Sequence, residues 1–210
     1  MSDPNAIAAG PPSPTSRKAL DALLDAMIEH PEKHLEIAAE VEARFGQDQA
    51  TLILDMTGFT RTTRTHGIVS FLLMIHQMHR MTCPSIKAHG GNLIKTEADN
   101  LFCLFDTVQA ALAASLDIIH RLEMVNFVLP EDRHLYASIG IGYGRILNIE
   151  NRDLFGDEVN LSCKLSEDIA ARNAILLTER AYAQLPPRSD MVQQEVSLSG
   201  LPLVYYELAR

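Results

Sequence analysis

The 210-residue sequence predicts one α/β sandwich domain with a mixed, mostly antiparallel sheet, preceded by two short helices. Apolar strands alternate with helical segments along the chain, which is typical of an α/β fold. Several neighbouring strands are joined by turns too short to hold a crossover helix, so we expect them to pair as antiparallel hairpins. The length suits one globular domain with appendages better than two full domains.

The first 47 residues divide into a tail and two helices. Residues 1–16 are rich in proline and small residues, which predicts a flexible tail. Apolar side chains then recur at helical spacing, and Pro31 can open a second helix that Gly46 closes. We therefore expect a helical extension over residues 17–47 and the main domain over residues 48–210.

The main domain has a regular succession of expected elements. Alternating and helical apolar patterns separate them, with Gly and Pro at the junctions. We expect strands at 51–56, 92–96, 101–105, 136–144, 174–177, 192–198 and 203–208, with 145–149 pairing back on 136–144, and helices at 70–81, 108–124, 159–171 and after the N-cap Thr178.

Composition excludes several function classes. The net charge of -9, from 27 acidic and 18 basic residues, argues against nucleic-acid binding. No apolar run is long enough to cross a membrane, and the N-terminus lacks a secretory pattern, so we expect a cytoplasmic protein. Cys83, Cys103 and Cys163 are odd in number and have no metal-ligand spacing, which favours buried, reduced thiols.

The first candidate motif follows the first strand of the main domain. Asp55 ends that strand, and Thr57, Gly58 and Thr60 follow it. Backbone N–H groups that turn out of a strand toward a helix can hold phosphate oxygens, and a neighbouring carboxylate can hold a divalent cation bridging to them. Taken alone, Asp55 is better explained as a residue that caps the next turn.

Two further segments contain candidate site residues. Asp99 lies in the polar turn between two expected strands, where a plain turn aspartate is the common alternative. Asn160 and Lys164 are four residues apart, so they share one face of a helix, and Asp153 lies just ahead of that helix.

Together the three segments, in this order and spacing, resemble the catalytic domain of the class III adenylyl/guanylyl cyclases. The resemblance covers residues 48–208 and includes the glycine-spaced strand at 139–144. It implies a ferredoxin-like, mostly antiparallel sheet with flanking helices, the nucleotide-cyclase fold. It also implies cyclisation of a nucleoside triphosphate with two metal ions, Mg²⁺ or Mn²⁺, at each site.

The resemblance assigns roles to individual residues. Asp55 and Asp99 match the two metal-binding aspartates, and Met56 matches a residue whose backbone carbonyl assists the metal. Lys164 matches a transition-state cation, and Asn160 a residue that orients the ribose. The segment expected to wrap the triphosphate is made of Thr57, Gly58, Phe59 and Thr60.

Lys95 and Asp153 match the residues that read the base in this family. Adenine offers a donor at its 6-amino group and an acceptor at N1, so Asp153 can accept and Lys95 can donate. Guanine reverses both groups, and each mismatch would leave a buried polar group unsatisfied at a cost of roughly 1–3 kcal/mol. The pair therefore favours ATP, with a cyclase for another base as the alternative.

The family builds each site from two subunits, and this chain carries both residue sets, so a two-fold homodimer is expected. Three departures leave a second function class open. The position of Lys164 is an arginine in the family, Ala98 stands where glycine is usual, and residues 199–201 lack a phosphate-binding lysine. The alternative is a weak or silent nucleotide-binding module that signals to a regulatory partner through the N-terminal helices.

Overall fold

The structure, a computed structural model, describes residues 13–57, 59–198 and 201–209. Residues 1–12 of the predicted tail therefore lie outside the described residues, as does Gly58. No helix in the described ranges is long and apolar enough to cross a membrane.

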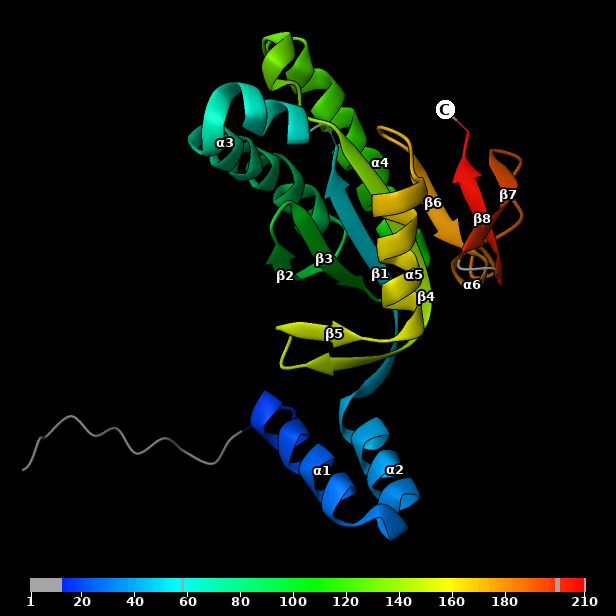
Figure 1. Ribbon diagram of the computed structural model, residues 1–210. Coiled ribbons are helices and arrows are strands. Elements are labelled where there is room, and N and C mark those ends of the chain that lie inside the picture. The colour runs from blue at the N-terminus through cyan, green and yellow to red at the C-terminus, as the bar shows by residue number, and fades with distance from the viewer. Residues whose placement is uncertain (1–12, 58, 199–200, 210) are drawn as a thin grey trace, which may run out of the picture.

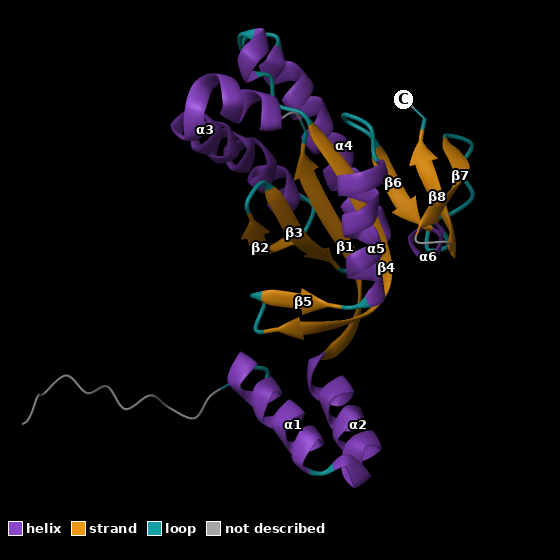
Figure 2. Ribbon diagram, in the orientation of Figure 1, coloured by secondary structure: helices purple, strands orange, loops and turns teal. Residues whose placement is uncertain are grey.

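One sheet of eight strands forms the centre of the molecule (Figures 1 and 2). The strands follow the order β2-β3-β1-β4-β6-β8-β7, and β5 pairs with β4 beside this path. The strands are β1 (Gly46–Met56), β2 (Asn92–Glu97), β3 (Asn100–Phe105), β4 (Ala137–Ile149), β5 (Asp153–Phe155), β6 (Ile175–Thr178), β7 (Met191–Leu198) and β8 (Leu201–Leu208). Only β4 and β6 pair in parallel, which confirms a mixed, mostly antiparallel sheet among the described strands.

Helices cover both faces of this sheet. The helices are α1 (Arg17–Glu29), α2 (His34–Phe45), α3 (Phe59–Ala88), α4 (Val108–Asn126), α5 (Asp157–Lys164) and α6 (Glu179–Tyr182), with short turns η1 (Pro31–Lys33), η2 (Glu131–Arg133) and η3 (Leu165–Ile169). The succession β1-α3-β2-β3-α4-β4 gives the spatial order β2-β3-β1-β4, which is the ferredoxin-like arrangement that was expected.

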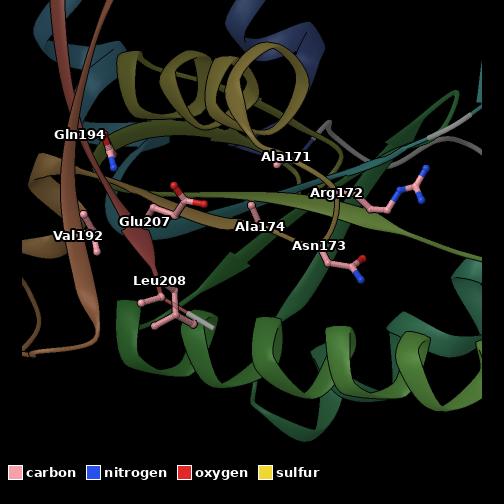
Figure 3. A pocket seen from close by; sticks show the side chains of 9 residues that line it. Ala171, Arg172, Asn173, Ala174, Val192, Gln194, Glu207 and Leu208 are labelled. Carbon is pink, nitrogen blue, oxygen red and sulfur yellow. The ribbon is translucent and has the colours of Figure 1, made fainter.

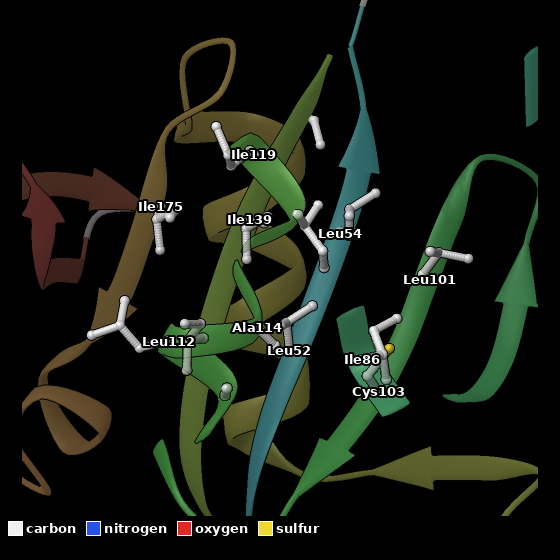
Figure 4. Packing of buried hydrophobic residues seen from close by; sticks show 14 of the residues in the cluster. Leu52, Leu54, Ile86, Leu101, Cys103, Leu112, Ala114, Ile119, Ile139 and Ile175 are labelled. Carbon is white, nitrogen blue, oxygen red and sulfur yellow. The ribbon is translucent and has the colours of Figure 1, made fainter. Parts of the chain in front are cut away.

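Alternation along β1 sends side chains to two separate clusters. Leu52 and Leu54 are fully buried against α3 and α4, in the large cluster of Figure 4. Ile53 points to the other face, where Val159 of α5 covers it. Successive side chains of a strand point to opposite faces, so the apolar run of β1 requires layers on both sides. β1 is thereby fixed as a central strand.

The structure corrects the prediction for residues 136–149. A single strand, β4, runs through Gly140, Gly142 and Gly144 to Ile149, and β5 is the segment that pairs back on its end. The glycines serve close packing rather than a turn. A Cβ at Gly140 would lie 2.1 Å from the carbonyl oxygen of Ser162, so α5 can approach the strand only because side chains are missing there.

Two helices also differ from their predicted bounds. α3 extends well beyond 70–81 at both ends, with a non-helical break at Gly67 (φ 78°) and with Pro84 inside it. Buried Met78 before the proline and Ile86 after it pack on the same cluster, which explains why the helix continues. The helix predicted over 159–171 is divided into α5 and the π-helical turn η3.

The other predicted elements are confirmed within a few residues. The N-terminal segment forms two helices, with Pro31 opening the turn η1 between them and Gly46 following α2. The Thr178 hydroxyl accepts a hydrogen bond from the N–H of Ala181 (3.1 Å) and so caps α6 as expected. The three cysteines are free; Cys103 is buried, whereas Cys83 and Cys163 are partly exposed.

Candidate active site

The sheet register brings Asp55 and Asp99 to the same place. β1 pairs with β3 up to Leu54 and Leu101, so Asp55 leaves β1 beside the end of the β2–β3 hairpin, whose turn holds Asp99. Burial, followed by the negative charges of Asp99 and Glu167, raises the pKa of Asp55 to about 7. Burial also raises the pKa of Asp99. Two partly buried carboxylates thus lie near enough at the predicted metal site for the charge of Asp99 to raise the pKa of Asp55.

Glu167 is the third acidic residue here, and no sequence motif assigned it a role. It lies in η3, and the Nδ2 of Asn100 donates to its Oε1 at 2.6 Å. The second amide atom of Asn100, Oδ1, is buried and has no hydrogen-bond partner within the described chain. A helical pattern could not place Glu167, because the π-helical turn changes the phase of the helix just before it.

The donor set fits a divalent cation. Asp55 and Asp99 supply hard oxygen ligands, and like charges at short range favour a bound cation over two bare carboxylates. Across the described residues, no three His, Cys, Asp or Glu side chains form a ready-made metal site. Two protein carboxylates are enough for Mg²⁺, which keeps water and substrate oxygens as its other ligands.

Ala98, which stands where glycine is usual in the family, adopts an unusual backbone conformation for an L-residue. Its φ is 51°, in the left-handed region that glycine occupies freely. The hairpin therefore keeps the conformation that a glycine would give, and the alanine bears the strain. Asp99 is held at the tip of a tight turn between β2 and β3.

The segment predicted to wrap the triphosphate is described in part. Met56 ends β1 and is buried, and the N–H of Thr57 donates to the carbonyl of Tyr136 at 3.1 Å. The Thr57 hydroxyl is buried without a hydrogen-bond partner in the part of the chain that is described. Phe59 and Thr60 begin α3, although their side chains are not described, and Gly58 lies outside the described residues.

Lys95 and Asp153 form an ion pair in the structure. Nζ of Lys95 lies 2.8 Å from Oδ1 of Asp153 and 2.6 Å from Oε1 of Glu97, and it sits 4.6 Å from the centroid of the Phe102 ring. Burial alone would raise the pKa of Asp153, but hydrogen bonds from Lys95 and the Leu154 N–H, with nearby positive charge, lower it overall. The two predicted base-reading residues, 58 positions apart in sequence, are thus adjacent and oppositely charged.

Arg17 of α1 also contacts this pair, and nothing in the sequence pointed to it. Its Nη2 donates to Oδ2 of Asp153, and its guanidinium lies 5.1 Å from the centroid of the Phe155 ring. The contact joins residues 136 positions apart. It places the N-terminal helices against the residues predicted to read the base.

Asn160 and Lys164 lie on the exposed face of α5. Lys164 pairs with Asp168 one turn later, with Nζ 2.8 Å from Oδ2, and no described contact joins it to Asp55 or Asp99 of its own chain. Both atoms of this pair are solvent-exposed, so Lys164 can exchange Asp168 for another anion. Asn160 and Lys164 are therefore presented outward rather than toward the carboxylates of the same chain.

A separate hollow lies between the segment before β6 and the β7–β8 hairpin (Figure 3). Its volume is about 300 Å³, and its polar lining includes Arg172, Gln194 and Glu207. None of the predicted site residues lines it. The candidate active site, near the end of β1, the β2–β3 turn and the β4–β5 arm, is thus separate from this hollow.

Comparison with known proteins decides the family. No family model matches the sequence. A crystal structure of an adenylate/guanylate cyclase/hydrolase from Silicibacter pomeroyi matches 79% of this chain and 98% of that one, with 26% identity and a TM-score of 0.64. The chain belongs to the class III nucleotide cyclase family. The ordered motifs and the ferredoxin-like sheet are therefore those of a cyclase catalytic domain.

Curated relatives agree with this assignment. The adenylate cyclase of Streptomyces coelicolor is 28% identical over 130 residues, which are 62% of this chain and 32% of that protein. A Rhizobium meliloti relative is 24% identical over 142 residues, or 68% of this chain and 24% of its own length. The cyclase chain thus matches a quarter to a third of the length of these relatives.

More distant solved structures share the fold. The guanylyl cyclase Cya2 has 19% identity and a TM-score of 0.66 over 78% of this chain. A bacterial light-regulated adenylyl cyclase has 18% identity and a TM-score of 0.62 over the same share. Adenylyl and guanylyl cyclases thus share this fold, so the choice of base must be argued from the site itself.

Proposed function

We propose that the protein is an adenylate cyclase, which converts ATP to 3′,5′-cyclic AMP and pyrophosphate at sites shared between two copies of the chain. The observation that carries the proposal is the meeting of Asp55 and Asp99 at the end of β1. Among the described residues no ion pair is made by Asp55 or Asp99, so the two carboxylates suit divalent ions and the phosphates they bind.

The reaction requires little covalent chemistry from the protein. The ribose 3′-oxygen bonds to the α-phosphorus, the bond from that phosphorus to the β-bridging oxygen breaks, pyrophosphate leaves, and the hydroxyl proton passes to water. Bound divalent ions would neutralise the phosphoryl oxygens and lower the pKa of the 3′-hydroxyl. The chain's part is to orient the nucleotide and to place positive charge, from Lys164, near the leaving pyrophosphate.

Adenine recognition rests on Lys95 and Asp153. The pair presents one donor group and one acceptor group within 2.8 Å of each other, in an order that complements N1 and the 6-amino group. A guanine base would direct its own acceptor at Asp153 and its donor at Lys95. Base choice therefore depends on polar groups that one base satisfies and the other leaves unpaired.

The outward direction of Asn160 and Lys164 supports a shared site. In a two-fold dimer each chain would supply the carboxylates of one site and the α5 residues of the other. Solved structures with this fold include a guanylyl cyclase domain described as a non-canonical dimer in one structure and as monomeric in two others, at 17–20% identity, so the proposed arrangement rests on α5. The proposal is a homodimer with two equivalent sites and Mg²⁺ or Mn²⁺ as the metal.

The direct test is product analysis. Purified protein is incubated with Mn²⁺ and each of ATP, GTP, CTP and UTP, and cyclic nucleotide and pyrophosphate are quantified. Cyclic AMP and pyrophosphate in equal amounts, with ATP preferred, are the expected result. No product from any nucleotide, with ATP still bound, would contradict the enzyme assignment, and preferred turnover of GTP would contradict the choice of base.

One observation favours a second candidate, a nucleotide-binding module with feeble turnover. Lys164 is engaged by Asp168, and it stands in place of an arginine whose planar fork can hold two oxygens. Lys164→Arg distinguishes the two functions. A gain in kcat means that lysine limits an otherwise working enzyme, whereas ATP binding without turnover in both forms supports the module.

A further inference from the structure

The N-terminal helices are packed firmly against the arm made by β4 and β5 (Figure 1). Leu20 of α1 and Phe45 of α2 are buried with Ile149 at the end of β4. Arg145 of β4 reinforces this contact, with its Nε 3.0 Å from Oε2 of Glu42 and its Nη2 donating to the Glu42 carbonyl at 3.0 Å. The position of α1 relative to β5 is therefore set by packing as well as by charge.

This packing places Arg17, the first residue of α1, over β5. Ser16 caps the helix by accepting from the Ala19 N–H at 3.2 Å, which fixes the backbone immediately before Arg17. The guanidinium lies beside the Phe155 ring and donates to Asp153. Phe155 and Asp153, both in β5, thus hold the Arg17 side chain, although it is 48% exposed.

The two oxygens of Asp153 are held in different ways. Oδ1 accepts from Lys95 Nζ at 2.8 Å and from the Leu154 N–H at 2.9 Å. Oδ2 accepts from Arg17. A carboxylate has about four acceptor positions, so three of them are used and one remains, on Oδ2.

The free position on Oδ2 is where a donor from the base can bind. The terminal torsion of aspartate has a broad energy minimum, and its two oxygens turn together, so every hydrogen bond to either oxygen narrows that movement. Arg17 is the described partner of Oδ2, while Lys95 and the backbone hold Oδ1. One of the three groups that orient this acceptor thus comes from the N-terminal helices.

We infer that Arg17 is a specificity-determining positioning residue, which holds Oδ2 of Asp153 ready to accept from the 6-amino group of adenine. The inference rests on the proposed base-reading role of Asp153. It gives the N-terminal helices a function in nucleotide choice. Any partner that displaces α1 would act on base recognition rather than on the metal-binding carboxylates.

The test compares Arg17→Ala, Arg17→Lys and the control Lys18→Ala with the wild-type chain. Lys18 is the next residue of α1, is exposed, and makes no ion pair with any described residue. Lys18→Ala therefore removes one positive charge, as Arg17→Ala does, but breaks no contact with Asp153. Each protein is assayed for KM and kcat with ATP and GTP in Mn²⁺. Affinities for the α,β-methylene analogues of ATP and GTP, which cannot release pyrophosphate, are measured by equilibrium dialysis.

For Arg17→Ala we expect the KM and analogue Kd for ATP to rise about threefold to tenfold, as for loss of one partly exposed charge-assisted contact. The preference for ATP over GTP should fall by a similar factor, while kcat at saturation stays within about twofold. Arg17→Lys should restore part of the preference, and Lys18→Ala should match wild type. An Arg17→Ala protein with unchanged base preference, or with equal losses for both nucleotides, would overturn the inference.

Asp153→Asn, measured in parallel, separates this inference from the proposed function. If Asp153→Asn changes base preference and Arg17→Ala does not, Arg17 has no positioning role and the base-reading assignment stands. If Asp153→Asn leaves base preference unchanged, the base-reading role fails and the inference fails with it. Arg17→Gln, which keeps length and polarity, replaces Arg17→Ala if that variant unfolds at a lower temperature than wild type.

Discussion

Two charged clusters of this protein combine their charges in opposite ways. Asp55, Asp99 and Glu167 bring like charges together, and the pKa of Asp55 is raised to about 7, first by burial and then by the other two carboxylates. Lys95 and Asp153, with Arg17, bring opposite charges together, and the pKa of Asp153 is lowered despite its burial. The negative charge of the first cluster favours binding of a cation from solution. In the second cluster, Lys95 and Arg17 already neutralise the charge of Asp153.

The clusters also differ in how they are supported. Asp55 lies near the end of β1, a central strand buried on both faces, and Asp99 lies in the turn between β3 and the edge strand β2. Lys95 and Asp153 come from β2 and from the three-residue strand β5, with Arg17 added from a helix outside the sheet. The proposed metal-binding cluster is therefore held by the main sheet, whereas the proposed base-reading cluster also depends on contacts from β5 and α1.

The largest expected effect is on the carboxylate cluster. Asp55→Asn and Asp99→Asn should each lower kcat by about a hundredfold or more, since each removes an anchor for charge neutralisation at the phosphates. Steady-state assays with ATP and Mn²⁺ measure this. Asp190→Asn, which removes an exposed carboxylate paired with Arg188, is the control and should leave kcat unchanged. Full activity in either site variant would remove that residue from the metal site.

Mixing two inactive variants tests whether each active site is shared between two chains. Asp55→Asn and Asn160→Ala damage different residue sets, so a mixed dimer should contain one intact site of two. Random exchange of subunits then predicts about a quarter of wild-type activity. Recovery is measured after the two proteins are mixed and re-equilibrated. A mixture that stays as inactive as its components would mean that each chain builds its whole site alone.

The raised pKa of Asp55 predicts a pH effect on metal-free stability. Between pH 4 and 7 the folded state holds a proton on Asp55 that the unfolded state releases, so stability falls as pH rises through this window. A pKa shift of this size in a half-buried group should, after screening by solvent, change the free energy of unfolding by about 1–2 kcal/mol across this window. Urea unfolding in EDTA from pH 4.5 to 8 measures it.

Asp55→Asn is the matched control for that pH effect. It should be more stable than wild type at pH 8 without metal and should lose most of the slope between pH 4.5 and 7. Added Mg²⁺ should stabilise wild type more at pH 8 than at pH 5, because the ionised carboxylate binds it. A wild-type stability that rises steadily from pH 4.5 to 8 in EDTA would contradict the crowding of carboxylates at this site.

The smallest expected effect concerns the turn that carries Asp99. Ala98 adopts φ 51°, which costs an L-residue about 1–2 kcal/mol, part of which glycine gives back through its greater freedom in the unfolded chain. Ala98→Gly should therefore raise the free energy of unfolding by about 0.5–1 kcal/mol in urea denaturation. A loss of stability would show that the turn prefers a conformation other than the one observed.

The sequence predicted those parts of the site that depend on local order. Asp55 at a strand end and Asp99 in a polar turn between two strands follow from apolar patterns, and the pairing of β1 with β3 then brings them together. Asp153 was expected near Lys95 through the family resemblance, and the ion pair of 2.8 Å agrees with that expectation. Their assigned roles in metal and base binding stay predictions.

Other features could not be derived from sequence because they depend on tertiary packing. Arg17 reaches Asp153 across 136 positions, and only the docking of α1 on the β4–β5 arm makes that contact. Glu167 reaches Asn100 through a π-helical turn that shifts the helix phase. Gly140 was expected inside a strand, but its packing role depends on α5, because a Cβ there would lie 2.1 Å from the carbonyl oxygen of Ser162.

If the carboxylate cluster binds metal while Lys95 and Asp153 read the base, only the first cluster should determine how many Mn²⁺ ions bind. Free Mn²⁺ is titrated by electron paramagnetic resonance against wild type, Asp55→Asn and Asp153→Asn, each with the α,β-methylene analogue of ATP. We expect two ions per site in wild type, loss of at least one in Asp55→Asn, and unchanged stoichiometry in Asp153→Asn at saturating analogue. Wild-type binding of Mn²⁺ by Asp55→Asn would contradict this division of roles.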